Sequence, residues 1–563
     1  MLMVDDPAVT VNITILGGSF AHGIVSGTTQ TGGIYFRANA DSSLAVDGTT
    51  FTDLGQSVCV HRDTPAGARI TIKNCEIFNV ATRQGDWAAM SVKGGQATVE
   101  NCCFHDNGTD DNPDLDMWDY WTGNGPSTLI LRNNCFDGGN VKKHPLVLAA
   151  RSKINQDIEN PNNTFVNYPD SHQWAPIRGT VPAGAQAFWG ETGLDYVVTG
   201  STLVNADATS GTGSLTIAPG QNIFFKTVDQ KNPPCLIISG SFEARGTEAE
   251  PITFAPYPSE GPSGDITTQY LRGRLLFEHC VYDGLQRGIH IQAYSSLLSG
   301  VAPPLLMVQH CVFKNIVQNP ICISGDAYDG NNALIDHCLI YGTTGSSAAH
   351  SGYDLCFKGF RSGVNVYRCF PRVTSTTIAN NSGGGAYLEY SNSTFTNCII
   401  FGNGPTTSPR ALTLVSSNPA VAYSCVQGGF SGTGNIASDP LFADPDRGDY
   451  HLKSQAGRWD PSTSGGAGGW VTDGVTSPCI DAGDPAAAYS NEPEPNGGRI
   501  NMGAYGNTAY ASKSVAGTGG GDTTPPTAPS NLRVTGTTAS SITIAWDASY
   551  EASGIEEYII EIK

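Results

Sequence analysis

The stretch that decides the fold is Arg69–Phe78, which reads Arg-Ile-Thr-Ile-Lys-Asn-Cys-Glu-Ile-Phe. Its first five residues alternate between polar and apolar, which is the period of a half-buried β-strand. Asn74 then interrupts the alternation, and Asn is one of the few residues that tolerate the left-handed backbone of a tight turn. Cys75 and Ile77 lie two positions apart, so they share one face and are expected in the core. The stretch predicts a strand, a turn and a second strand.

The same signature recurs along the chain at intervals of about 29 residues. Its copies begin at Gly17, Gly48, Asn74, Asn101, Asn133 and Asn162, and after a lapse at His279, His310, His337, Arg368, Asn397 and Ser424. Short strands at this period predict an all-β parallel solenoid, in which each rung buries its apolar side on the next. The turn residues and cysteines should then stack in ladders about 4.8 Å apart. The three His are expected to form a structural stack, and the cysteines to be buried thiols, with disulfides left open.

The composition agrees with this architecture and excludes some functions. The chain has 563 residues, of which 67 are Gly and only 15% are charged, as in turn-rich β proteins. Its net charge of −20 argues against a nucleic-acid partner and is compatible with bound cations. No apolar run is long enough for a membrane span. The first ten residues lack the pattern of a secretory signal peptide.

The repeat and its cysteine ladder resemble those of the right-handed parallel β-helix proteins over roughly residues 10–440. Pectate lyases and many secreted carbohydrate-active enzymes share this fold, so the resemblance implies a secreted or cell-surface protein whose partner is a polysaccharide. Hydrolases, epimerases, adhesins and phage tailspikes use the same fold, which therefore does not select an activity. The lapse in the signature predicts two β-helical units, 1–173 and 191–438, joined by a linker at 174–190.

The remaining chain predicts three further segments. Residues 439–514 resemble the cap at the end of secreted bacterial β-helix proteins, which protects the last rung of a solenoid. Residues 515–529 form a Gly/Thr/Pro-rich linker. Residues 530–563 resemble the opening strands of a fibronectin type III domain, which needs about 100 residues, so we expect only part of that domain here. The sequence does not predict an oligomeric state.

Chemistry is predicted on one outer face of the first unit. If the apolar residues of successive strands point inward, five residues form one outward column: Arg37, His61, Lys93, Tyr120 and Arg151. Lys93, Arg151 and His61 are the candidate catalytic residues. The candidate substrate-binding residues are Arg37, Trp118, Tyr120, Trp121, Lys142, Lys143 and His144.

An acidic stretch beside this column predicts a calcium site. Its candidate ligands are Asp110, Asp111, Asp114 and Asp116, because Ca²⁺ prefers carboxylate and carbonyl oxygens from flexible loops. Calcium or a basic residue would neutralise the carboxylate of an anionic, uronic-acid glycan, and a Lys or Arg would remove the neighbouring proton. This arrangement favours a polysaccharide lyase if the chain is an enzyme. Acidic surface loops are more often solvated than metal-bound, and the column also fits a set of ordinary exposed positions.

Two alternatives stay open. A non-catalytic adhesin or structural stalk is favoured by the modular C-terminus and by the lack of a lyase motif. A β-helix glycoside hydrolase is less favoured, because the Gly-His-Gly signature of the polygalacturonase type is replaced here by Ala21-His22-Gly23. The outward column of the second unit has no cluster of charged residues, so a scaffold role is expected for that unit. That column contains His290, Cys322, Cys356, Tyr387 and Thr413.

Overall fold

The computed structural model describes most of the chain, and every structural statement below refers to the described residues. These are 1–21, 33–80, 88–107, 112–118, 125–158, 160–169, 173–207, 211–228, 233–269, 271–293, 306–325, 333–345, 353–358, 360–362, 365–367, 370–405, 407–515, 530–538 and 541–547. The chain divides into two compact units, Met1–Ser438 and Asp439–Lys563. The boundary lies where the sequence predicts the start of the cap.

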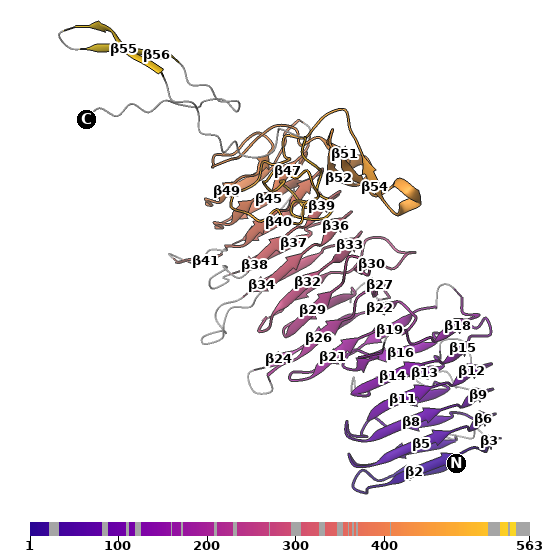
Figure 1. Ribbon diagram of the computed structural model, residues 1–563. Coiled ribbons are helices and arrows are strands. Elements are labelled where there is room, and N and C mark those ends of the chain that lie inside the picture. Colours follow the sequence, from indigo (N-terminus) through magenta and orange to yellow (C-terminus); the bar gives the residue numbers. More distant parts are fainter. Residues whose placement is uncertain are drawn as a thin grey trace. The chain divides into compact units, whose positions relative to one another are not determined.

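The first unit is a parallel β-solenoid, as predicted, in which two long sheets run through the whole stack (Figure 1). We call the 16-stranded sheet A and the 15-stranded sheet B. Sheet A contains β1 (Leu2–Asp5), β4 (Ile34–Arg37), β7 (Val58–Val60), β10 (Met90–Val92), β13 (Leu115–Asp116), β16 (Leu146–Ala149), β19 (Ala175–Arg178), β22 (Tyr196–Val198), β27 (Asn222–Phe225), β30 (Ile252–Pro256), β33 (Cys280–Asp283), β36 (Val312–Lys314), β39 (Leu339–Tyr341), β44 (Thr377–Ala379), β47 (Ile399–Phe401) and β50 (Cys425–Val426). Sheet B contains β2 (Asn12–Leu16), β5 (Ser43–Asp47), β8 (Arg69–Lys73), β11 (Gln96–Glu100), β14 (Thr128–Arg132), β17 (Lys153–Ile154), β21 (Gln186–Trp189), β26 (Ser214–Ile217), β29 (Ser241–Arg245), β32 (Leu275–Glu278), β35 (Leu306–Gln309), β38 (Ala333–Asp336), β43 (Arg372–Thr374), β46 (Thr394–Thr396) and β49 (Ala420–Ala422).

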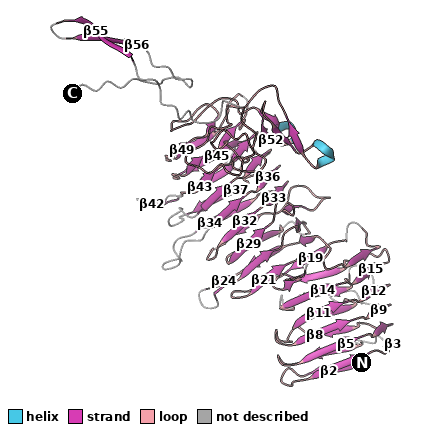
Figure 2. Ribbon diagram, in the orientation of Figure 1, coloured by secondary structure: helices cyan, strands magenta, loops and turns pink. Residues whose placement is uncertain are grey.

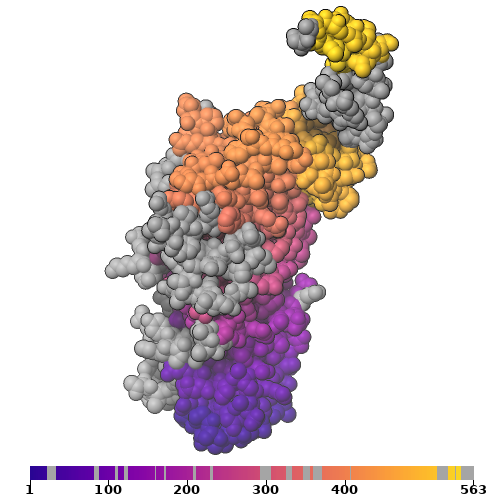
Figure 3. Space-filling model, turned by 90° about the vertical axis from the view of Figure 1, so that its left-hand side faces the viewer, coloured from indigo at the N-terminus to yellow at the C-terminus, as the bar shows by residue number. Residues whose placement is uncertain are grey.

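Two shorter sheets complete the rungs, sheet C after sheet B in the first rungs and sheet D between sheets A and B in the later ones. Sheet C contains β3 (Ser19–Ala21), β6 (Thr50–Thr52), β9 (Glu76–Phe78), β12 (Cys103–His105), β15 (Cys135–Asp137) and β18 (Thr164–Val166). Sheet D contains β20 (Thr180–Val181), β23 (Ser201–Val204), β28 (Cys235–Ile238), β31 (Ile266–Thr268), β34 (Ile289–Ala293), β37 (Ile321–Gly325), β40 (Tyr353–Lys358), β45 (Gly384–Glu389) and β48 (Leu412–Val415). Two antiparallel pairs project from the rungs: β24 (Ala206–Asp207) with β25 (Gly211–Thr212), and β41 (Phe360–Ser362) with β42 (Asn365–Tyr367). In the space-filling view the colour of the first unit passes from indigo through magenta to orange along the chain (Figure 3).

The lapse in the sequence signature marks a change of rung shape. In the first rungs the third strand follows sheet B, as β9 follows β8, whereas from β20 onward it lies between sheets A and B. Asn74 therefore turns the chain from sheet B into sheet C, while His279 turns it from sheet B into sheet A. The predicted linker 174–190 instead contains β19 and β21, which continue sheets A and B without interruption, and β20, which begins sheet D. The two predicted units are thus one stack with two kinds of rung.

The predicted ladders are confirmed. Asn74 and His279 have left-handed backbones, with φ of 53° and 47°. Phe104 and Phe136 stack with ring centroids 4.7 Å apart inside the solenoid. The three imidazoles also stack, His279 on His310 at 4.9 Å and His310 on His337 at 5.0 Å. All cysteines among the described residues are free thiols, which the prediction had left open.

Two copies of the signature were placed wrongly by the sequence pattern. Leu339 pairs with Thr377, so Ser375, with φ of 42°, is the turn residue of that rung. Arg368, to which the sequence pattern assigned this turn, lies outside the described residues. In the last copy the turn residue is Tyr423 and not Ser424, with φ of 47°. A hydroxyl replaces the expected thiol in both rungs, at Thr376 and Ser424, which hid the repeat from a search for Cys.

The left-handed turn at Asn133 gives a first testable prediction. Its φ is 54° and its side chain is exposed. An alanine there would pay the cost of a left-handed backbone, about 1–2 kcal/mol, and would lose little packing. We expect Asn133→Ala to lower the free energy of unfolding by about 1 kcal/mol, measured by urea titration of the full chain. Asn133→Gly is the control, because glycine adopts this backbone freely. Equal losses in the two variants would contradict this account of the turn.

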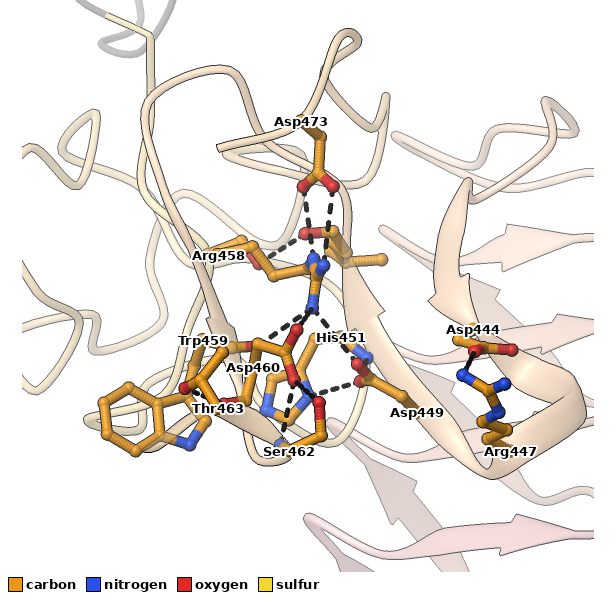
Figure 4. Close-up of polar contacts among 12 residues, drawn as sticks. Asp444, Arg447, Asp449, His451, Arg458, Trp459, Asp460, Ser462, Thr463 and Asp473 are labelled. Carbon is orange, nitrogen blue, oxygen red and sulfur yellow. Dashed lines mark hydrogen bonds and ion pairs between the residues drawn. The ribbon is translucent and has the colours of Figure 1, made fainter. Parts of the chain in front are cut away.

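The second unit is small, irregular and antiparallel (Figure 2). It contains β51 (Phe442–Asp444), η4 (Pro445–Arg447), β52 (Asp449–Leu452), β53 (Arg458–Asp460), η5 (Thr463–Gly466), β54 (Gly469–Val471), β55 (Ser530–Thr537) and β56 (Ile542–Asp547). Arg458 joins its segments, because Nε lies 3.1 Å from Asp473 and Nη1 lies 3.1 Å from Asp449 (Figure 4). β55 and β56 form an antiparallel pair, and the fibronectin type III assignment stays a prediction.

Candidate functional site

The outer face of sheet A carries a row of polar and aromatic side chains across the first rungs. In β4, β7 and β10 the alternate residues Ile34, Val58 and Met90 are buried in the core. The residues between them face outward, and the parallel register places Cys59 beside Ser91, and Ser91 beside Asp116. The next outward residues are Arg37, His61 and Lys93, whose strands remain in hydrogen-bonded register.

Lys93 and Asp116 form the centre of this row. Lys93 Nζ lies 3.0 Å from Asp116 Oδ2, and the two side chains are only 15% and 10% exposed. Burial raises the pKa of Asp116, and Lys93 opposes that shift. The Trp118 backbone N–H donates to Asp116 Oδ1 at 3.0 Å, which fixes the carboxylate. Burial also raises the pKa of the neighbouring Cys59 to about 12. Lys93 and Asp116 therefore form a largely buried ion pair on an outer face of the solenoid, and the Trp118 backbone fixes its carboxylate.

Trp118 and Arg178 flank the ion pair. The Arg178 guanidinium lies 5.2 Å from the centroid of the Trp118 ring, within the range of a cation–π contact. The positive charge of Arg178, like that of Lys93, partly opposes the rise in the pKa of Asp116, so both cations act on the same carboxylate. Arg178 was not predicted as a site residue, because the lapse in the repeat signature placed it in a linker. Tyr120 and Trp121, the other predicted aromatic residues, lie outside the described residues.

Arg37 and His61 lie at the first rungs of the same row. Arg37 contacts Asp63 at 2.8 Å and Asp5 at 3.2 Å. The His61 ring lies 5.9 Å from the ring of Tyr35, and burial lowers the pKa of His61. Arg37 therefore has carboxylate partners within the fold.

Arg151 does not belong to the row of Lys93. Asp116 pairs with Val147, so Ala149 rather than Arg151 comes opposite Trp118. Arg151 lies two residues beyond Ala149, after the end of β16, and burial lowers its pKa. The single column predicted from alternation therefore breaks at this rung, because strand length and turn position cannot be read from alternation alone.

Lys143 and Asp114, predicted as substrate-binding and metal-binding residues, meet inside the protein. Lys143 Nζ lies 2.9 Å from Asp114 Oδ1, with exposures of 1% and 0%. Lys143 also donates to the Asn107 carbonyl at 2.5 Å, and Tyr168 donates its hydroxyl to Asp114 Oδ2 at 2.5 Å. The alternating pattern gave no sign that these charges face each other across the corner of two rungs.

The predicted calcium ligands are not gathered in the described part of the chain. There, no group of three or more His, Cys, Asp and Glu residues could hold a metal ion. Asp114 and Asp116 each contact a lysine, and Asp110 and Asp111 lie outside the described residues. The calcium site stays a prediction.

An aromatic cluster extends the face of sheet A beyond Arg178. His144 lies 4.0 Å from Trp174, and Trp174 lies 5.7 Å from Tyr257, as ring centroid distances. Lys226 Nζ lies 4.7 Å from the Trp174 ring and 4.3 Å from the Tyr257 ring. Lys142 is exposed beside this region. Tyr257 and Lys226 belong to rungs for which a scaffold role was expected, and no local sequence signal connected them with Trp174.

No helix in the described part of the chain has the length and apolar character needed to cross a membrane. No curated protein matches this chain. Residues 276–483 match the sequence model of a family described as disaggregatase related. Over that stretch, from sheet B at β32 into the second unit, the chain is therefore similar to disaggregatase-related proteins.

Proposed function

We propose that the chain is an extracellular protein that binds an anionic polysaccharide along the outer face of sheet A, and that Lys93 and Asp116 form a site for β-elimination on it. The observation that carries the proposal is the largely buried Lys93–Asp116 ion pair, with Trp118 and Arg178 beside it. A row of aromatic and cationic side chains on successive rungs suits a polymer of charged sugars, because aromatic faces bind sugar rings and cations bind carboxylates. The disaggregatase-related match lies in later rungs and supports a function in disaggregation, for which an extended polymer is a fitting substrate.

In the proposed reaction a carboxylate of the substrate replaces the Asp116 carboxylate as the ion-pair partner of Lys93. A uronate carboxylate takes the place of Asp116 as the partner of Lys93, which neutralises its charge and acidifies the proton on the adjacent carbon. Asp116, whose pKa burial raises, accepts that proton. The C–H electrons form a C=C bond, and the glycosidic oxygen leaves from the next carbon. Arg151, whose pKa burial lowers, is the second candidate base. Calcium held by Asp110 and Asp111 remains a proposed aid to charge neutralisation.

The test uses the purified chain with a panel of uronic-acid polysaccharides, with calcium and with chelator. Elimination is read from the ultraviolet absorbance of the unsaturated sugar, hydrolysis from reducing ends without that absorbance, and binding from retardation in a gel containing the glycan. Absorbance supports elimination, and its loss on chelation supports calcium. Retardation alone supports a binding module. No product and no retardation would contradict the proposal.

Variants at the ion pair assign the roles. We expect Lys93→Ala to weaken glycan binding about tenfold, since losing one cation–carboxylate contact costs roughly 1.4 kcal/mol. Asp116→Asn should keep binding and lose product formation, whereas Arg151→Lys should keep both if Asp116 is the base. Arg447→Ala is the control, because that side chain is 88% exposed and lies in the second unit. Unchanged binding by Lys93→Ala would contradict the assignment.

A further inference from the structure

A pair of cysteines occupies the outer face of sheet D, away from the row on sheet A. Cys322 in β37 pairs directly with Cys356 in β40. Their strand neighbours Ile321, Ile323 and Leu355 are buried in the core, so the two thiols point outward. They are nevertheless only 7% and 1% exposed, because they pack with Tyr387 of the next rung in a small cluster of their own.

The geometry of the pair suits a disulfide bond. Residues directly opposite each other on neighbouring strands lie about 4.8 Å apart, which falls within the Cα separation of 4.4–6.8 Å seen for disulfides. The two side chains also lie in one small cluster with Tyr387. The bond therefore needs rotation of side chains and little movement of the backbone.

The groups facing the pair stabilise a thiolate at Cys322. The hydrogen bond with Cys356 is the largest cause that lowers the pKa of Cys322 to about 5, and His290 and Lys358 act in the same direction. The pKa of Cys356 is raised well above its ordinary value by the same hydrogen bond. His290 pairs with Cys322 in β34, and Lys358 Nζ lies 5.5 Å from the Tyr387 ring. The acidic groups nearby are Glu389, which accepts from the Tyr387 hydroxyl at 3.2 Å, and Asp265, which interacts with His290 and Arg287.

The inner cysteine ladder has similar strand spacing but a different environment. Cys311 and Cys338 are 0% exposed among apolar side chains and Tyr282. Burial raises the pKa of both thiols well above the ordinary value. Adjacent strands alone therefore do not activate a thiol. The outer pair differs through His290, Lys358 and its place on an outer face.

We infer that Cys322 and Cys356 are a reversible modification site that reacts with low-molecular-weight disulfides to form an intramolecular bond between neighbouring rungs. The Cys322 thiolate attacks one sulfur of the small disulfide, forms a mixed disulfide and releases one thiolate. Cys356 then loses its proton and attacks the Cys322 sulfur, which forms the protein disulfide and releases the second thiolate. Two electrons pass from the cysteine pair to the small disulfide, which is reduced to two thiols.

The experiment exposes the full native chain to oxidised glutathione, blocks the remaining thiols with N-ethylmaleimide and maps every cysteine peptide by mass spectrometry. We expect a Cys322–Cys356 linked peptide, while Cys280, Cys311 and Cys338 remain reduced. At pH 6 Cys322 should react at least tenfold faster than the partly buried Cys103 and Cys235, because burial raises the pKa of those two thiols and the larger thiolate fraction of Cys322 outweighs its weaker nucleophilicity. An unmodified pair beside glutathionylated Cys103 or Cys235 would overturn the inference.

Variants separate the two steps. In Cys356→Ser, glutathione should remain attached to Cys322, because the second thiol is missing. Lys358→Gln should slow the modification of Cys322, whereas Lys314→Gln is the matched control, since Lys314 lies on sheet A and contacts Asp283 at 3.2 Å. Release of glutathione from Cys322 in the Cys356→Ser variant at the wild-type rate would also overturn the inference.

Discussion

Lys143→Ala is expected to lower the free energy of unfolding by about 3–5 kcal/mol at neutral pH, which is the usual cost of removing one partner of a buried ion pair. The reason is that Asp114 stays behind, fully buried, next to the uncharged Tyr168 hydroxyl and Asn107. Burial already raises the pKa of Asp114, and Lys143 is the largest opposing influence. Without the lysine the carboxyl must hold a proton in the folded state.

This requirement gives the loss a defined pH dependence. A carboxyl whose pKa is higher in the folded protein binds more protons there than in the unfolded chain, so stability falls as pH rises through the interval between the two values. The difference between Lys143→Ala and the wild type should therefore shrink as the pH falls from 7 toward 5. Urea titrations of the full chain at both pH values measure it.

Two further variants check the cause. The double variant Lys143→Met/Asp114→Leu removes both charges and should recover most of the loss, since well-packed apolar residues often replace buried ion pairs without cost. Arg245→Ala removes one partner of an exposed, 3.8 Å ion pair and should change stability by no more than about 0.5 kcal/mol. A loss below about 1 kcal/mol for Lys143→Ala would contradict the role of the pair.

Glu492→Gln is expected to stabilise the second unit at pH 8 by about 2–3 kcal/mol and to remove most of the pH dependence of its local opening. Burial raises the pKa of Glu492 from its ordinary value of 4.5 to about 7, and the nearby Asp481 raises it further. In the folded state Glu492 Oε1 accepts the backbone N–H groups of Asn501 and Asn507, both at 2.8 Å. Glutamine keeps that acceptor and carries no charge. Each pKa unit corresponds to about 1.4 kcal/mol.

The sign follows from the raised value. Between pH 4.5 and about 7 the folded unit holds a proton that the unfolded unit has lost, so its stability declines as the pH rises through this interval. Hydrogen exchange of the Asn501 and Asn507 amides reports the local opening. Glu494→Gln, an exposed neighbour, is the control and should leave the profile unchanged. A pH profile of Glu492→Gln that matches the wild type would refute the assignment.

The fold could be predicted from the sequence because its determinants are local. Asn74 and Asn101 each indicate a left-handed turn, and the apolar residue three positions later indicates a core position. The repeat can therefore be recognised from stretches of only four residues. The change from sheet C to sheet D was misread as a linker, because the signature reports the exit from sheet B and not which sheet comes next.

The candidate site was predictable only in part, because it depends on contacts between rungs. Lys93 was predicted to be an outward-facing cation, whereas its partner Asp116 was predicted to be a calcium ligand. Arg178 joins them from a later rung, and whether a side chain from a distant rung reaches a neighbour depends on strand length and loop volume. The same limit hid the contact between Lys143 and Asp114, which the sequence pattern assigned to substrate binding and to calcium, because the two residues meet at a corner between rungs.

The change of rung shape near residue 178 also divides the molecule into two sets of interchangeable building blocks. Within the first set, excision of residues 69–95 would join Ala68 to Gln96, and Gln96 already occupies the register position of Arg69 on the neighbouring strand. A duplication or loss of that length preserves every ladder. A crossover between the two sets would leave a strand of sheet C facing a strand of sheet D with no common corner. Genetic recombination can therefore lengthen or shorten this protein within each block, whereas the junction between blocks is inherited as one piece.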